Sequence, residues 1–208
     1  VVRAILLDPE ARDCNLVDDP LAGRLREPMV RWAQLCRAFN ASSEKGIFRN
    51  SMDGFYEDTG QRPLASPSVF NFFQPDYQPI GPIDSADLVA PEFQISNSVS
   101  IVGFANRLHE WVMNTDDVME YRSNFYGEWY GDKLGNLDLT DELALDQLTE
   151  VGQLLERLNL ILFHGQMTDF TRGTIRTALE QVPQTNWDVR VRMAIFLSMI
   201  SPDYLILR

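Results

Sequence analysis

The chain has 208 residues, of which 45% are hydrophobic and 23% are charged, so it contains enough apolar side chains to form a globular core. Its 18 Lys and Arg residues and 30 Asp and Glu residues give a formal net charge of −12. Because the nucleic-acid backbone is also negative, and no basic cluster compensates, nucleic acid is excluded as an expected partner. No apolar stretch approaches the roughly 20 residues that a membrane-spanning helix needs.

Two helical patterns are present in the first forty residues. Residues 2–12 read as the end of a helix, so the chain is expected to be part of a longer protein. Residues 28–39 predict an amphipathic helix with a proline in the first turn, where the missing N–H is harmless. One face is polar and carries Arg31, Gln34 and Arg37. The opposite face carries apolar residues at spacings of three and four: Met29, Trp32, Ala33, Cys36 and Phe39.

Helical periodicity is absent between about residues 40 and 90, where Gly, Pro, Asn, Asp and Ser are frequent. An irregular segment of this length is unusual inside a compact domain. It is therefore expected to be either a partner-binding excursion or an ordered loop that covers the helices. Its centre, SPSVFNFFQPDYQPIGP at residues 66–82, is rich in aromatic residues.

Two interpretations of these aromatic residues are open. In the favoured one, Phe70 and Phe73 are buried against neighbouring helices and hold the loop in place, with each buried Phe contributing about 1.5–3 kcal/mol. The alternative is a binding surface for a sugar or a peptide, in which Phe72 and Tyr77 are exposed beside Asp76.

A helical pattern returns at Pro91 and continues to residue 113, as one helix or as two that meet near residues 96–98. Glu92 lies in the first turn, where the positive end of the helix dipole favours an acidic side chain. Residues 115–140 form a second irregular segment, which is again aromatic and interrupted by glycines.

The C-terminal part of the chain predicts three successive helices. Thr168 and Asn186 are the expected N-caps of the second and third, and His164-Gly165 is expected to end the first. The three helices span residues 142–163, 169–182 and 187–200.

The fold class that follows is mainly α. We expect an irregular helical bundle with long, ordered loops rich in aromatic, Pro and Gly residues, and little or no sheet. Residues 1–208 are expected to be a single helical region that forms the C-terminal part of a larger domain. Within it, residues 142–208 are expected to pack as a three-helix C-terminal unit, with Leu155, Leu158, Ala194 and Ile195 inside.

No catalytic motif is visible in the sequence. His109 and His164 are the only histidines, and His109 lacks the second His, four residues further on, that a zincin-type metal site requires. We expect His109 to be partly buried and hydrogen-bonded, and His164 to stabilise a helix C-terminus. The sequence has no phosphate-binding glycine loop and no calcium-binding loop, and no metal or cofactor is predicted. For Cys14 and Cys36, a disulfide and a buried free thiol at Cys36 are both open, and the free thiol is favoured.

An ordered set of short motifs resembles a large bacterial family, the domain-of-unknown-function family numbered 1800. In chain order the motifs are DPEAR, REPMVR, GQRPLASPSVFNFFQPDY, LVAPEFQIS, ILFHGQMT and RVRMAIFLSMISPDYLILR. The resemblance covers nearly the whole chain and matches the C-terminal part of a family member. In the commoner form of the family a Gly-Trp pair follows the Val-Phe of the aromatic motif, whereas this chain has Asn71-Phe72-Phe73, which indicates a subgroup.

The resemblance implies an extracytoplasmic role without naming a reaction. Family members look exported, to the periplasm or outside the cell. They tend to be encoded beside an exported protein that resembles the alkaline phosphatase and sulfatase superfamily, which implies a protein partner.

Two functions follow as hypotheses. The first is a non-catalytic binding or scaffolding protein that acts with a partner. The alternative is part of an extracytoplasmic, hydrolase-like enzyme whose catalytic groups lie mostly upstream of this region. The candidate binding residues are Phe72, Asp76, Tyr77, Glu92 and His109.

Overall fold

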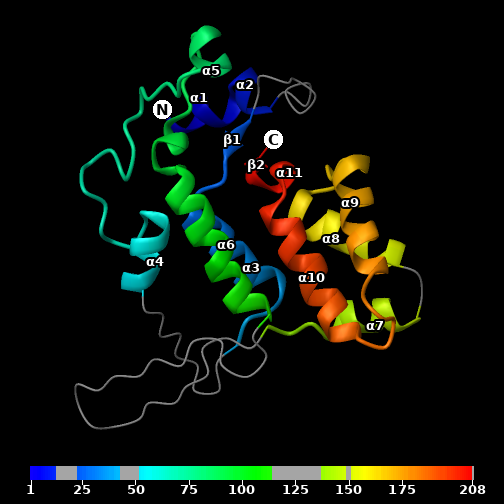
Figure 1. Ribbon diagram of the computed structural model, residues 1–208. Helices are drawn as coiled ribbons and strands as arrows, with labels where there is room; N and C mark the ends of the chain where they lie inside the picture. Colours follow the sequence, from blue (N-terminus) through cyan, green and yellow to red (C-terminus); the bar gives the residue numbers. More distant parts are fainter. Residues whose placement is uncertain (13–22, 43–51, 114–136, 149–150, 208) are drawn as a thin grey trace, which may run out of the picture.

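The structure is a computed structural model that describes residues 1–12, 23–42, 52–113, 137–148 and 151–207. It is mainly α-helical, as predicted, and its described part contains a single two-stranded pairing as sheet. Figure 1 shows the elements, which in chain order are α1 (Val2–Leu7), α2 (Pro9–Arg12), β1 (Arg24–Leu25), α3 (Pro28–Ala38), α4 (Met52–Thr59), α5 (Pro82–Ser85), the 3-10 helix η2 (Pro91–Ile95), α6 (Ser98–Met113), α7 (Thr140–Leu148), α8 (Val151–Phe163), α9 (Asp169–Glu180), α10 (Trp187–Ile200), α11 (Pro202–Leu205) and β2 (Ile206–Leu207).

Helices α7 to α10 pack together around a common apolar interior. Helix α10 contacts α7, α8 and α9, and α8 also contacts α7 and α9. The side chains expected inside this unit are completely buried: Leu155, Leu158, Ala194 and Ile195. The helix predicted over residues 142–163 corresponds to α7 and α8, and residues 149–150 between them lie outside the described part of the chain.

Local signals explain where α8 ends and where α9 begins. Helix α8 is followed by His164 and Gly165, which have φ values of 56° and 85° and turn the chain in a left-handed conformation. The Thr168 side chain accepts a hydrogen bond from the Thr171 amide and so caps α9 as predicted. Asn186 precedes α10, but its side chain makes no capping hydrogen bond.

A buried ion pair joins α10 to α7 inside this unit. Arg190 Nε and Nη2 donate to the two carboxylate oxygens of Asp146 at 2.9 and 3.2 Å, and both side chains are buried. Arg190 Nη1 also donates to the carbonyls of Leu179 and Val182, at 2.9 and 3.1 Å. A single guanidinium therefore neutralises Asp146 and caps the C-terminal end of α9.

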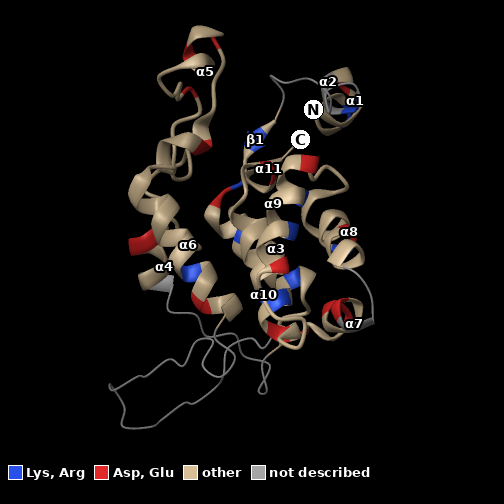
Figure 2. Ribbon diagram, turned by 45° about the vertical axis from the view of Figure 1, so that its right-hand side comes forward, with Lys and Arg blue, Asp and Glu red and all other residues tan. Residues whose placement is uncertain are grey.

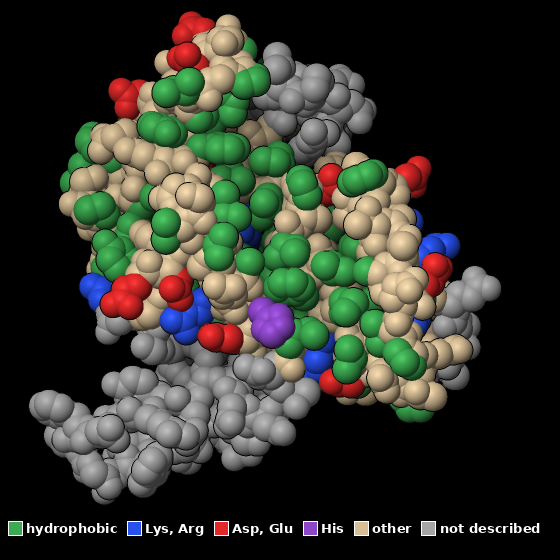
Figure 3. Space-filling view, viewed as in Figure 1, with side chains coloured by type: hydrophobic (Ala, Val, Ile, Leu, Met, Phe, Trp, Pro, Cys, Tyr) green, Lys and Arg blue, Asp and Glu red, His purple; other side chains and the backbone are tan. Residues whose placement is uncertain are grey.

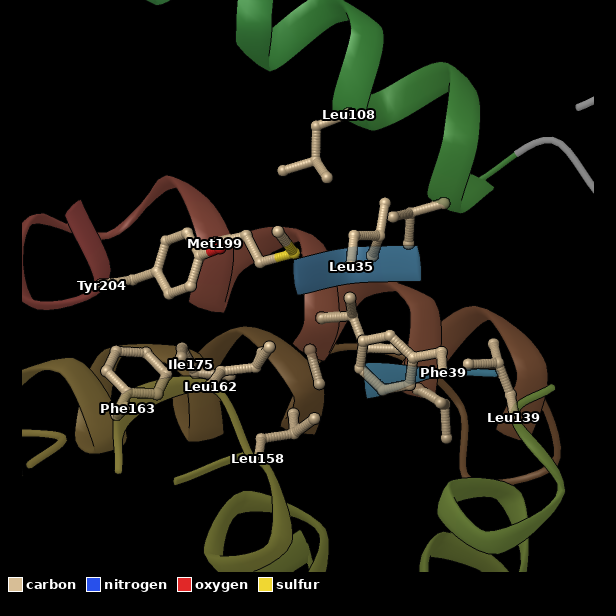
Figure 4. Packing of buried hydrophobic residues seen from close by; sticks show 14 of the residues in the cluster. Leu35, Phe39, Leu108, Leu139, Leu158, Leu162, Phe163, Ile175, Met199 and Tyr204 are labelled. Atoms are coloured by element: carbon tan, nitrogen blue, oxygen red, sulfur yellow. The ribbon is translucent and has the colours of Figure 1, made fainter. Parts of the chain in front are cut away.

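The apolar core continues from the C-terminal unit to α3 and α6. Figure 4 shows Leu35 and Phe39 of α3 and Leu108 of α6 directed toward Leu158 of α8 and Met199 of α10. The two short strands close the opposite end of this core, because Arg24 and Leu25 pair antiparallel with residues 206–207 near the C-terminus.

The pattern from Pro91 to residue 113 forms two elements, η2 and α6. Asn97 separates them, because its side-chain oxygen accepts hydrogen bonds from the amides of Val99 and Ser100, at 2.9 and 3.1 Å, and caps α6. The Ser100 hydroxyl in turn donates to the Ile95 carbonyl at 2.6 Å, which satisfies an acceptor at the end of η2.

Helix α4 is a regular element that the sequence pattern did not indicate. It packs on α6 at Gly103, where a Cβ atom would lie 2.2 Å from the backbone oxygen of Asp58. Arg107, one turn further along α6, pairs with the Asp58 side chain. The aromatic ring of Phe55 completes the contact by stacking on Trp111, with 5.8 Å between the ring centroids.

The expectation that Phe70 and Phe73 hold the irregular segment against the helices is wrong for Phe70. Phe70 is 53% exposed and Phe73 is only half-buried, and no residue from 62 to 99 is buried. Figures 1 and 2 show why, because the segment that carries α5 projects away from the helical bundle. The segment is therefore an excursion and not a cover, and the large loss on truncating Phe70 that burial would imply does not apply.

Two further expectations fall partly outside the described residues. Cys36 is a free, half-buried thiol on α3, in agreement with the favoured alternative, whereas Cys14 lies outside the described residues. Most of the second irregular segment, residues 114–136, also lies outside them.

Substitution of Gly103 tests the close approach of α4 and α6. Because the added methyl of Gly103→Ala would meet backbone atoms that cannot move independently, we expect it to lower the free energy of unfolding by about 1–3 kcal/mol or more. The matched control is Gly173→Ala in α9, where no heavy atom lies within 4 Å of the added Cβ. This control should raise the free energy of unfolding by about 0.5–1 kcal/mol in urea titrations. Equal effects of the two changes would contradict the proposed contact.

Breaking the buried ion pair should be severe. Asp146→Ala leaves Arg190 buried without its carboxylate, and we expect a loss of about 3–5 kcal/mol in the free energy of unfolding. Asp188 is a half-exposed carboxylate whose Oδ2 lies 2.8 Å from Nε of Arg192. Asp188→Ala should therefore lower the free energy of unfolding by less than about 1 kcal/mol. Similar losses for both variants, measured by chemical denaturation, would show that burial does not set the strength of these pairs.

Burial raises the pKa of the Cys36 thiol to about 11. Because the thiolate is the reactive form and is populated only above the pKa, alkylation of Cys36 near pH 8.5 should be on the order of 100-fold slower than that of an unburied cysteine. The experiment treats a Cys14→Ser variant with iodoacetamide and follows alkylation of the Cys36 peptide by mass spectrometry. The alkylation rate should keep rising with pH until about pH 11. A rate that levels off near pH 9 would contradict the raised pKa.

Candidate functional site

The aromatic segment lies beside the 3-10 helix η2. The amide of Gln74 donates to the side-chain oxygen of Gln94 at 2.6 Å, and the amide of Ala90 donates to the carbonyl of Tyr77 at 2.9 Å. These two hydrogen bonds hold residues 74–77 next to residues 90–94 along the excursion.

Four of the five residues proposed from the sequence therefore belong to one region of the surface. Asp76 is exposed, and Phe72, Tyr77 and Glu92 are half-buried. None of the four is enclosed, so their side chains are open to a partner or a large ligand and do not form the interior of a closed catalytic pocket.

His109 lies apart from this region, near the C-terminal end of α6. Its side chain is exposed, in contrast to the expected partial burial, and its ring meets the ring of Phe196 on α10 edge-on, with 5.7 Å between the centroids. It is exposed because α6 directs Phe104 and Leu108 into the core and leaves His109 at the margin of the α6–α10 contact. The structure therefore does not bring His109 together with Asp76 or Glu92. His164 is exposed as well, directly after the end of α8.

Two further properties bear on the kind of site that the chain can form. Among the described residues, no group of three or more His, Cys, Asp or Glu side chains is arranged to hold a metal ion. Within the same residues, no helix combines the length and the apolar character needed to cross a membrane.

Hydrophobic side chains are exposed on α6, where a surface helix normally carries polar residues. Val99, Ile101 and Val102 form this surface, which we call the α6 face, and each is at least 50% exposed. Figure 3 shows hydrophobic side chains spread across the side of the molecule that carries α6 and α10, with basic atoms visible between them. Figure 2 shows acidic residues on α4, α5 and α7.

Two arginines are buried around Tyr204, where α3 and α11 meet. Arg26 lies over the Tyr204 ring, with Cζ 4.6 Å from the centroid. Arg26 Nη1 donates to the Gln34 side-chain oxygen and to the Leu162 carbonyl, the latter at 3.1 Å, and the Tyr204 hydroxyl donates to the same Gln34 oxygen at 3.1 Å. Burial raises the pKa of Tyr204 to about 12, and the neighbouring arginines oppose this shift. Tyr204 is thus neutral at physiological pH.

Arg31 is the residue that sequence reasoning missed. It was expected on the polar face of α3, but it is 7% exposed and its Cζ lies 3.8 Å from the ring centroid of Phe104. The buried residues of α3 are Pro28, Arg31 and Leu35, which form one stripe at spacings of three and four, and the predicted apolar residues Met29 and Trp32 lie beside this stripe and are only partly buried. Burial lowers the pKa of Arg31 to about 10, so the side chain still carries its charge at neutral pH. A basic residue inside an apolar pattern was the available signal.

Comparison with known proteins places the chain in a family without assigning an activity. The model of the family described as "Protein of unknown function (DUF1800)" matches residues 1–206. The comparison with curated proteins and the comparison with solved structures give no match. The family resemblance seen in the sequence motifs is therefore confirmed over nearly the whole chain, and the protein belongs to the DUF1800 family.

Proposed function

We propose that this chain is a helical binding or scaffolding protein that acts together with a partner protein. The observation that supports the proposal is the exposed apolar surface formed by the α6 face and the excursion beside it. On the excursion, large apolar side chains are again exposed: Leu64, Val69, Phe70, Ile80 and Val89. Apolar side chains concentrated in this way are typical of surfaces that another protein covers.

The distribution of charge supports the same function. The formal net charge of −12 keeps exposed apolar surfaces of two copies apart, since like-charged molecules repel each other. A partner with a less acidic surface would approach without this repulsion. The family resemblance suggests an exported partner related to the alkaline phosphatase and sulfatase superfamily, and a periplasmic or secreted location for the complex.

The alternative of an extracytoplasmic enzyme has less support from the described residues. It required Asp76, Glu92 or His109 to contribute to catalysis from this part of the protein. His109 is held at α10 by the Phe196 ring, whereas Asp76 and Glu92 lie on the excursion, and none of the three is buried. Catalytic acids and bases usually lie in a water-excluding cleft where their pKa values can be shifted.

Substitution of the α6 face tests the proposal. Val102→Asp places a charge at a position that is 57% exposed, so the fold should persist while an apolar interface there is disrupted. The affinity-tagged full-length protein, returned to its native source, should recover a defined partner protein. The amount recovered should fall by about tenfold or more with Val102→Asp.

The matched control is Leu160→Asp on α8, where the replaced side chain is 60% exposed and outside the α6 face. This variant should recover the partner in the same amount as the unmodified protein. Circular dichroism and melting temperature should be alike for all three proteins. Undiminished recovery with Val102→Asp would rule out the α6 face as the interface.

A further inference from the structure

Arg31 is a buried cation for which the described part of the chain supplies no anion. Its guanidinium meets the face of the Phe104 ring, and no described residue forms an ion pair or a side-chain hydrogen bond with it. Nε is completely buried without a hydrogen-bond partner. Within the described part of the chain the terminal nitrogens also form no hydrogen bond, and the residue keeps 7% of its surface accessible.

Arg190 shows how the same fold treats a buried arginine whose role is structural. Its guanidinium donates to both carboxylate oxygens of Asp146 and to two backbone carbonyls, so that each of its three nitrogens forms a hydrogen bond. A buried charge without such partners is strongly unfavourable. Arg31 is therefore as deeply buried as Arg190 but lacks its carboxylate and carbonyl partners among the described residues.

The described side chains around Arg31 carry no negative charge that could pair with it. Tyr204 is neutral, because burial raises its pKa to about 12 and its hydroxyl donates to Gln34. Arg26, on the Tyr204 ring, adds a second cation whose Nε is also buried without a partner. Two guanidinium groups thus create a local positive potential inside a protein with a formal net charge of −12.

We propose that Arg31 is the centre of a binding site for a carboxylate, at the junction of α3, α6 and α11. A guanidinium presents parallel N–H groups that match the two oxygens of a carboxylate. The Phe104 ring covers one face of the guanidinium and is itself only 1% exposed, so a ligand reaches Arg31 through its N–H groups and not across the ring. A singly charged anion fits better than a phosphate, since the acidic surface repels multiply charged anions more strongly.

Two sources can provide this chemistry, a free small acid or a carboxylate of a polypeptide. The site is independent of the α6 face, because Arg31 and Phe104 do not belong to it. A failure of the carboxylate site and a failure of the proposed partner interface therefore give different results.

The experiment titrates the full-length protein with benzoate as the free acid, with N-acetylphenylalanine as the polypeptide-like carboxylate, and with benzamide as the neutral control. Both acids should bind at millimolar concentrations and raise the melting temperature, and benzamide should not. Tighter binding of benzoate assigns the site to small acids, and tighter binding of N-acetylphenylalanine assigns it to a polypeptide carboxylate.

Three variants identify the residue responsible. Arg31→Met should lose about tenfold or more of the affinity, and Arg31→Lys should also weaken binding because a lysine lacks the planar pair of donors. Arg37→Met, an exposed position on the same helix, should bind like the unmodified protein. Without ligand, Arg31→Met should melt at the same temperature as the unmodified protein or higher, since it removes an uncompensated buried charge.

Two results would overturn the proposal. One is the absence of binding of either acid to the unmodified protein, read from the Nε–Hε signals of its arginines by NMR, which needs no variant. The other is equal binding to Arg31→Met and to the unmodified protein. If neither acid binds to the unmodified protein and Arg31→Met also melts at a lower temperature, Arg31 has a purely structural role over the Phe104 ring.

Discussion

Helix α10 is apolar on nearly all of its sides, and this single property determines how the other helices are arranged. A helix with one apolar stripe can lie on a surface, whereas one that is apolar all round must be enclosed. Val191, Ala194, Ile195 and Met199 are completely buried, and α6, α7, α8, α9 and α11 all contact α10. Helices that are distant in the sequence, α6 among them, are thereby brought to the C-terminal unit.

Enclosing α10 forces its polar residues to find partners inside the protein. Arg190 does so through Asp146 and the end of α9, which makes the charge part of the framework that holds α7, α9 and α10 together. Arg31 on α3 is also buried, but its guanidinium meets only the ring of Phe104 on α6. Two arginines of similar depth therefore separate into one that stabilises the fold and one whose charge is available to a ligand.

The sequence predicted those parts of the fold that depend on neighbouring residues. Thr168 and the His164-Gly165 turn act locally, so the end of α8 and the start of α9 were correctly expected. The environment of Phe70 was not predicted, because whether an aromatic residue is buried depends on a distant surface being there to receive it. Arg31 was misplaced for a related reason: the neighbouring elements bury the stripe of α3 that carries Pro28, Arg31 and Leu35, which lies beside the apolar stripe that the sequence indicates. Of the candidate site, the sequence indicated the residues on the excursion and missed the buried cation.

The acidic surface and the buried guanidinium act on a ligand over different distances. Repulsion from a net charge of −12 is screened beyond the Debye length, about 8 Å at physiological ionic strength, and it falls on any anion regardless of shape. The attraction of Arg31 is felt only at contact, where the apolar surroundings lower the effective dielectric constant and strengthen it. An anion must therefore offset the general repulsion with the charge-assisted hydrogen bonds that its oxygens accept from the guanidinium. Selection by such a site depends on whether the anion presents two coplanar oxygens to the guanidinium, and not on its charge alone.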